Sequence, residues 1–137
     1  MKSFSEIDTI SKRASRALGY SWGISEEIGK NIRLLEMFGL NGIKNFNAYC
    51  SVFKKRKFQN ISLITKKNYS KTNSFCPITT GVNFLDQVKI LEELKELEFQ
   101  NVGFPLLFLP FVSRASEIIG KKIFLKLDNR EFLLNFN

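Results

Sequence analysis

The chain has 137 residues, of which 44% are hydrophobic and 25% are charged, and this length and composition fit a single globular domain over residues 1–137. It contains no histidine and two cysteines. This excludes Ser-His-Asp and Cys-His catalytic pairs, histidine metal sites and four-cysteine zinc sites. The net charge of +8 arises from 21 basic and 13 acidic residues. We expect a protein without a metal ion or another cofactor.

Three helices are predicted in the first 53 residues. Ser3 starts a capping-box pattern with the glutamate three residues later, and Gly19 has the place of a residue just after a helix. A second helix is expected from about residue 21 or 25 to Gly39, and Asn41 is a suitable N-cap for a third. Their apolar residues recur at helical spacing: Ile7, Ile10, Ala14, Ala17 and Leu18; Ile24, Ile28, Ile32 and Leu35; Ile43, Phe46, Tyr49 or Cys50, and Phe53.

No further helix is predicted between the third helix and residue 83. β-branched residues over 61–65 indicate a short strand. The polar segment 68–74 is typical of an exposed loop. Residues 75–81 are expected to be extended or turning, because Pro77 disfavours a helical conformation at the residue before it.

Two more helices are predicted in the C-terminal half. The first is capped by Asn83 and has its last apolar position at Leu97. The second lies within 104–120 and either bends or begins at Pro110. The outer face of the first of these helices is expected to be acidic, with Glu92, Glu93, Glu96 and Glu98.

The last residues give a β pattern. Alternating apolar residues over 123–127 and 132–136 predict a hairpin with one face toward the core. Two isolated strands are only marginally stable in water, so the strand over 61–65 is expected to join them. The predicted fold class is therefore α+β, with about five helices, an N-terminal helical hairpin and a small antiparallel sheet that includes a C-terminal β-hairpin.

The positive charge is concentrated in one segment. No acidic residue lies between Met37 and Leu85, and the rest of the chain is neutral. Basic residues there alternate with aromatic ones, a combination that can neutralise phosphates and stack on bases. An ordinary solvated surface, with lysine enriched by A/T-rich codon use, explains the same residues. The candidate sites for a nucleic acid or a small anion are Lys54, Lys55, Arg56, Lys57, Lys66, Lys67 and Lys71.

Tyr20, Trp22 and Cys76 are candidates for a small-molecule pocket. The only tryptophan falls in the turn between two helices, where it either packs in the corner or forms an aromatic pocket wall. Cys76 lacks a histidine to act as its base, so a buried apolar role is simpler than a nucleophilic one. An enzyme would combine Trp22 and Cys76 with residues 105–110.

Three segments resemble one uncharacterised bacterial family, the domain of unknown function numbered 3726. They are residues 19–30 (GYSWGISEEIGK), 76–81 (CPITTG) and 105–111 (PLLFLPF). The first of these motifs is the most specific. The resemblance implies that the three segments belong to one domain, and it implies no activity and no catalytic or binding residue.

The sequence also indicates where the protein works. The N-terminus has no apolar core of a secretory signal, and the longest apolar run, within 102–112, is shorter than the roughly 20 residues of a membrane span. We expect a soluble, cytoplasmic protein with reduced thiols and no membrane attachment. The favoured interpretation is a non-catalytic binding or accessory protein whose partner is another protein, a second copy of itself or a small anion. The alternatives are a nucleic-acid-binding protein using residues 54–71 and an enzyme.

Overall fold

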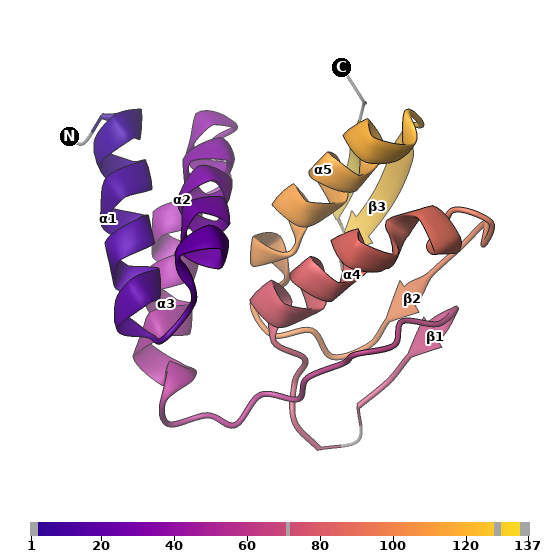
Figure 1. The fold of residues 1–137 in the computed structure, drawn as a ribbon, viewed down its shortest axis with the longest axis horizontal. Coiled ribbons are helices and arrows are strands. Elements are labelled where there is room, and N and C mark those ends of the chain that lie inside the picture. Colours follow the sequence, from indigo (N-terminus) through magenta and orange to yellow (C-terminus); the bar gives the residue numbers. More distant parts are fainter. Residues whose placement is uncertain (1–2, 71, 128–129, 135–137) are drawn as a thin grey trace. The chain divides into compact units, whose positions relative to one another are not determined.

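The computed structural model describes residues 3–70, 72–127 and 130–134. The chain divides into two compact units, Met1–Lys57, called the helical unit below, and Phe58–Asn137, called the mixed unit (Figure 1). Five helices, an N-terminal helical hairpin and a small antiparallel sheet at the C-terminus confirm the predicted α+β class. That the two units act as a single domain stays a prediction.

The helical unit consists of three helices. Ser3 caps the first of them, since its Oγ accepts a hydrogen bond from the Glu6 amide at 3.2 Å, as the capping-box pattern predicts. Gly19 and Gly39 follow the first two helices with φ angles of 102° and 68°, a backbone conformation that favours glycine. The bounds are Phe4–Ala17 for α1, Trp22–Met37 for α2 and Gly42–Phe53 for α3.

The third helix begins where it was predicted, with a different capping group. Asn41 is the N-cap residue, but its φ of 55° places it in the left-handed region and its side chain makes no capping hydrogen bond. Glu36, near the end of α2, supplies the acceptor instead, since its Oε1 lies 2.8 Å from the amide nitrogen of Ile43. A side chain from the preceding helix thus satisfies one free amide of the first turn.

The helices of this unit approach each other closely at glycines. A Cβ atom at Gly29 would lie 2.5 Å from Asp8 Oδ1 on α1, and one at Gly42 would lie 2.8 Å from the carbonyl oxygen of Ile32 on α2. Side chains of α2 and α3 are buried. Among them are Ile28, Ile32, Leu35, Phe46 and Tyr49.

The mixed unit contains α4, α5 and four short strands. Its buried core is formed by Ile64, Phe84, Val88, Leu91, Phe108, Val112 and Ala115. The elements are β1 (Lys67–Asn68), α4 (Pro77–Leu91), β2 (Glu98–Phe99), the 3-10 helix η1 (Pro105–Leu107), α5 (Leu109–Ile119), β3 (Ile123–Leu127) and β4 (Arg130–Leu134).

The prediction that residues 75–81 are extended or turning is wrong from Pro77 onward, because α4 begins there and Asn83 lies inside the helix instead of capping it. The restriction that proline imposes falls on Cys76, which is extended (φ −69°, ψ 122°) and serves as the N-cap. Pro77 itself suits the first helical turn, where no amide donor is needed. The helix ends at Leu91, so the expected acidic helix face is also wrong. Glu92, Glu93 and Glu96 lie in the segment between α4 and β2, and Glu98 lies in β2.

Residues 61–65 form no strand, which corrects both that prediction and the expected addition to the hairpin. Amide side chains of α4 bind this backbone instead. Gln87 Oε1 accepts from the Ile64 amide at 2.9 Å, and Gln87 Nε2 donates to the Ser62 carbonyl at 2.6 Å. Asn83 Nδ2 donates to the Ile61 carbonyl at 2.5 Å. β1 begins just after this segment and pairs in parallel with β2.

The segment 68–74 is only partly the exposed loop that was predicted. Asn68 and Ser74 are buried. Asn68 Nδ2 donates to the Thr65 carbonyl at 2.8 Å and to the Glu98 carbonyl at 3.0 Å, and its Oδ1 accepts from the Thr65 amide at 2.9 Å. This asparagine therefore holds the start of the segment against β2.

The C-terminal hairpin is confirmed. β3 and β4 pair antiparallel, with Ile123 opposite Leu134 and Leu127 opposite Arg130. The side chains of Ile123 and Leu134 pack against the core, whereas Phe124 on the other face is exposed. α5 supports the two strands, because Ser116 Oγ lies 3.0 Å from the Leu134 carbonyl oxygen. Residues 128–129, between the two predicted strands, and the last predicted apolar residue, Phe136, lie outside the described residues.

Candidate nucleic-acid interface

The predicted basic residues fall in both units. Lys54, Lys55, Arg56 and Lys57 are exposed and directly follow α3 in the helical unit. Lys66 and Lys67 are exposed at the start of β1 in the mixed unit. Lys71 lies outside the described residues. The first four residues are therefore the larger basic group within one unit, and whether the two groups act together stays a prediction.

Trp22 is exposed, so its packing in the helical corner is a wrong prediction. It is the first residue of α2, and 63% of its surface is accessible. Arg16 covers its ring instead, with the guanidinium carbon 4.4 Å from the ring centroid. Arg16 Nη1 also donates a hydrogen bond of 2.8 Å to the Tyr20 carbonyl. The cation is thereby held over the ring from the last turn of α1.

Tyr20 connects this corner to the end of α3. Its hydroxyl lies 2.5 Å from that of Tyr49, and its ring centroid lies 5.8 Å from that of Phe53. Phe53 is the last residue of α3 and precedes Lys54. The turn with Trp22 and the four basic residues therefore lie at the same end of the helical unit, where α1 and α3 end and α2 begins (Figure 1).

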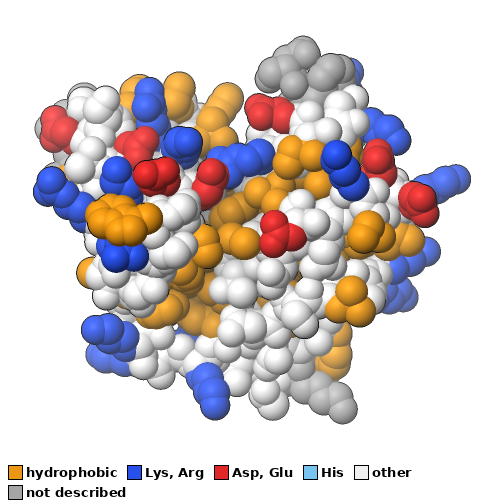
Figure 2. Space-filling model, viewed as in Figure 1, with side chains coloured by type: hydrophobic (Ala, Val, Ile, Leu, Met, Phe, Trp, Pro, Cys, Tyr) orange, Lys and Arg blue, Asp and Glu red, His pale blue; other side chains and the backbone are white. Residues whose placement is uncertain are grey.

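We call this region the basic–aromatic end, and its residues are Arg16, Tyr20, Trp22, Phe53, Lys54, Lys55, Arg56 and Lys57. Figure 2 shows exposed hydrophobic side chains next to Lys and Arg on the surface of the helical unit. Helix dipoles alone favour cations at the ends of α1 and α3. The helix dipoles do not explain why an exposed tryptophan, Trp22, packs against one of these cations, Arg16. Arg16 was missed by sequence reasoning, although its spacing of four residues from Tyr20 suits a contact at a helix end.

The third pocket candidate, Cys76, belongs to the other unit. Its side chain is 2% exposed, and its backbone amide donates to the Gln59 carbonyl at 3.1 Å. Tyr20 and Trp22 belong to the helical unit. A pocket formed jointly by the three residues therefore stays a prediction.

We expect both thiols to react slowly with an alkylating reagent. Burial raises the pKa of the Cys50 thiol above its ordinary value, and the thiolate is the reactive form. Just below the ordinary cysteine pKa of about 8.5, Cys50 should thus carry less thiolate and react more slowly than free cysteine. Its rate should keep rising with pH beyond the point at which free cysteine levels off.

Mass spectrometry of iodoacetamide-treated protein, sampled over time at several pH values, measures both rates separately. Cys76 should be slower than free cysteine because reagent cannot reach it without local opening. A Cys76 that reacts faster than free cysteine near neutral pH would support the enzyme alternative.

The described parts of the chain contain neither a metal-binding cluster nor a membrane-spanning helix. No group of three or more cysteine or carboxylate side chains there comes together so that it could hold a metal ion. No helix among those residues is long and apolar enough to cross a membrane.

Comparison with known proteins identifies the family. The family model described as a protein of unknown function (DUF3726) matches residues 2–75, more than half of the chain. No curated protein and no solved structure gives a significant match. The match contains the motif at 19–30, whereas the motifs at 76–81 and 105–111 lie beyond it. The chain belongs to this family of proteins of unknown function.

Proposed function

We propose that the protein is a non-catalytic binding protein whose basic–aromatic end binds single-stranded nucleic acid. The observation that carries the proposal is the exposed Trp22 ring, held against Arg16 at the same helix ends as four consecutive basic residues. The basic residues would neutralise phosphates, and the indole would stack on a base. Single strands are the favoured class, because their bases have free faces for stacking.

A cytoplasmic site of action fits this function. Cys50 and Cys76 form no disulfide, which is the usual state of cysteine in a reducing compartment. Lys66, Lys67 and Lys71 of the mixed unit stay separate candidates for binding an anion or a nucleic acid.

The single tryptophan makes the proposal directly testable. Because Trp22 is the only indole in the chain, its fluorescence should be quenched saturably by a thymidine oligonucleotide at about 50 mM salt. With a dye-labelled oligonucleotide and anisotropy as the readout, Trp22→Ala should weaken binding about tenfold, since stacking contributes about 1–3 kcal/mol per base.

Phe38→Ala is the matched control, because Phe38 is an exposed aromatic residue that follows α2 at the opposite end of the helix from Trp22. It should leave the affinity unchanged. Absence of any binding at low salt would refute the proposal. Equal affinity of the wild-type and Trp22→Ala proteins would refute the stacking of the indole on a base. The site would then bind the oligonucleotide through its charges alone.

A further inference from the structure

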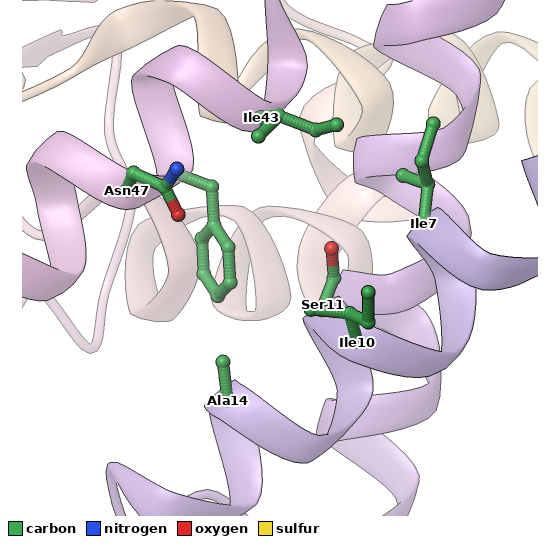
Figure 3. Close-up of a pocket in the computed structure, with 7 residues that line it drawn as sticks. Ile7, Ile10, Ser11, Ala14, Ile43 and Asn47 are labelled. Carbon is green, nitrogen blue, oxygen red and sulfur yellow. The ribbon is translucent and has the colours of Figure 1, made fainter. Parts of the chain in front are cut away.

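A cavity of about 120 Å³ lies between α1 and α3 of the helical unit (Figure 3). Its walls are apolar side chains of the two helices, including the ring of Phe46. Two polar residues, Ser11 and Asn47, take part in the lining, and none of the lining residues is charged. The cavity is therefore suited to a neutral molecule with a mainly apolar surface.

Ser11 gives the cavity a specific polar contact. Its side chain is 5% exposed, and Figure 3 shows its oxygen directed from α1 into the space between the helices. Within residues 3–70, 72–127 and 130–134, nothing forms a hydrogen bond with Ser11 Oγ. The neighbouring Ser15 hydroxyl, by contrast, donates to the Ser11 carbonyl at 2.7 Å. The hydroxyl faces the cavity, so it is placed to meet a polar group of a ligand.

We infer that this cavity is a binding site for a small neutral molecule with an apolar body and one hydroxyl group, of the size and class of phenol. An enclosed apolar cavity of about 150 Å³ accepts benzene. This one has about 120 Å³ and opens to solvent beside the exposed Ile10 and Asn47, so it would hold the ring of a phenol-sized ligand with part of the ligand left in solvent. Phe46 offers a ring against which an aromatic body can pack. Ser11 Oγ would exchange a hydrogen bond with the ligand hydroxyl. This site is separate from the basic–aromatic end, and the inference does not depend on the proposed function.

Phenol and toluene are the probes, because they share size and shape and differ in the hydroxyl. Titrations followed by protein NMR shifts should show saturable binding of phenol with a dissociation constant of about 1 mM, a reasonable value for so small a ligand. Ser11→Ala should weaken phenol about tenfold and leave toluene unchanged. Ala14→Leu fills the cavity from α1 and should abolish the binding of both probes.

Ala17→Leu is the control for the filling variant, because Ala17 is on the same helix, exposed and outside the lining. It should bind both probes like the wild type. Circular dichroism of each variant verifies the fold. If Ala14→Leu is unfolded, Ile10→Phe provides a second filling variant.

Three results would overturn the inference. The first is no saturable binding of either probe, which would mean that the cavity holds solvent only. The second is unchanged binding in a folded filling variant, which would place the probes elsewhere. The third is an equal effect of Ser11→Ala on phenol and toluene, which would remove the role of the hydroxyl.

Discussion

Replacing Gly81 with alanine is expected to lower the free energy of unfolding by about 2 kcal/mol and the melting temperature by about 6 °C. Gly81 lies inside α4, where alanine by itself would favour the helix by about 1 kcal/mol. Packing acts in the opposite direction and is larger. The added Cβ would lie 2.1 Å from Cδ2 and 2.5 Å from Cγ of Phe111 on α5. Phe111 is fully buried, so α4 and α5 would have to move apart.

Thermal and denaturant unfolding followed by circular dichroism measure this effect. Gly23→Ala is the matched control, because Gly23 lies in the first turn of α2 and a Cβ there has no heavy atom within 4 Å. That variant should be more stable than the wild type by about 0.5 kcal/mol. The same Gly→Ala substitution is therefore expected to lower the free energy of unfolding at position 81 and to raise it at position 23.

A variant of Phe111 tests whether its ring causes the loss of stability in Gly81→Ala. Phe111→Leu alone should destabilise the protein through lost packing. Combined with Gly81→Ala it should cost less than the sum of the two single changes, because the atoms that collide have been removed. A Gly81→Ala protein as stable as the wild type would contradict the close approach of α4 and α5.

The sequence predicted the elements whose stabilising contacts are local. Ser3 and Gly19 mark the ends of α1 through capping and backbone conformation within a few residues. The hairpin of β3 and β4 follows from alternation and a short connection. Both kinds of signal are independent of the rest of the fold.

The errors arise where distant side chains replace the expected backbone pairing. Residues 61–65 have strand-like composition, but Gln87 and Asn83 of α4 bind their backbone groups. No local pattern contains that information. The start of α4 at Pro77 was missed for another reason, since the pre-proline rule restricts Cys76 alone.

The candidate site was only partly predictable for the same reason. The sequence identified the basic cluster at 54–57 and the single tryptophan, Trp22, as two separate candidates. Their location at one end of the helical unit depends on the contacts of Tyr20 with Tyr49 and Phe53, which pair residues far apart in the chain. Exposure of Trp22 was also not predictable, because an aromatic residue in a turn is more often packed.

Neutralising Lys54, Lys55 and Lys57 together by glutamine should reduce affinity for a single-stranded oligonucleotide about 100-fold or more at about 50 mM salt. Each lysine that contacts a phosphate contributes about 0.7 to the slope of log affinity against log salt. The slope of the variant should therefore be smaller by about 2. These lysines are exposed, so the fold should be preserved. Anisotropy titrations at four or more salt concentrations give both quantities.

The control removes an equal charge from the mixed unit. Lys89, Lys95 and Lys122 are exposed there, and their triple glutamine variant has the same net charge as the test variant. If general attraction by the net charge explains binding, both variants should lose the same affinity and slope. If the basic–aromatic end is the site, the control should retain the slope of the wild type.

The Trp22→Ala variant separates the contribution of stacking to the affinity from the contribution of charge. Stacking releases no counterions, so Trp22→Ala should lower affinity by a similar factor at every salt concentration. The lysine variant should instead converge with the wild type as salt rises, because the lost contribution is the one that salt suppresses. A Trp22→Ala protein with a reduced slope would indicate that the indole positions Arg16 for a phosphate, and stacking on a base would then be the wrong role for the indole.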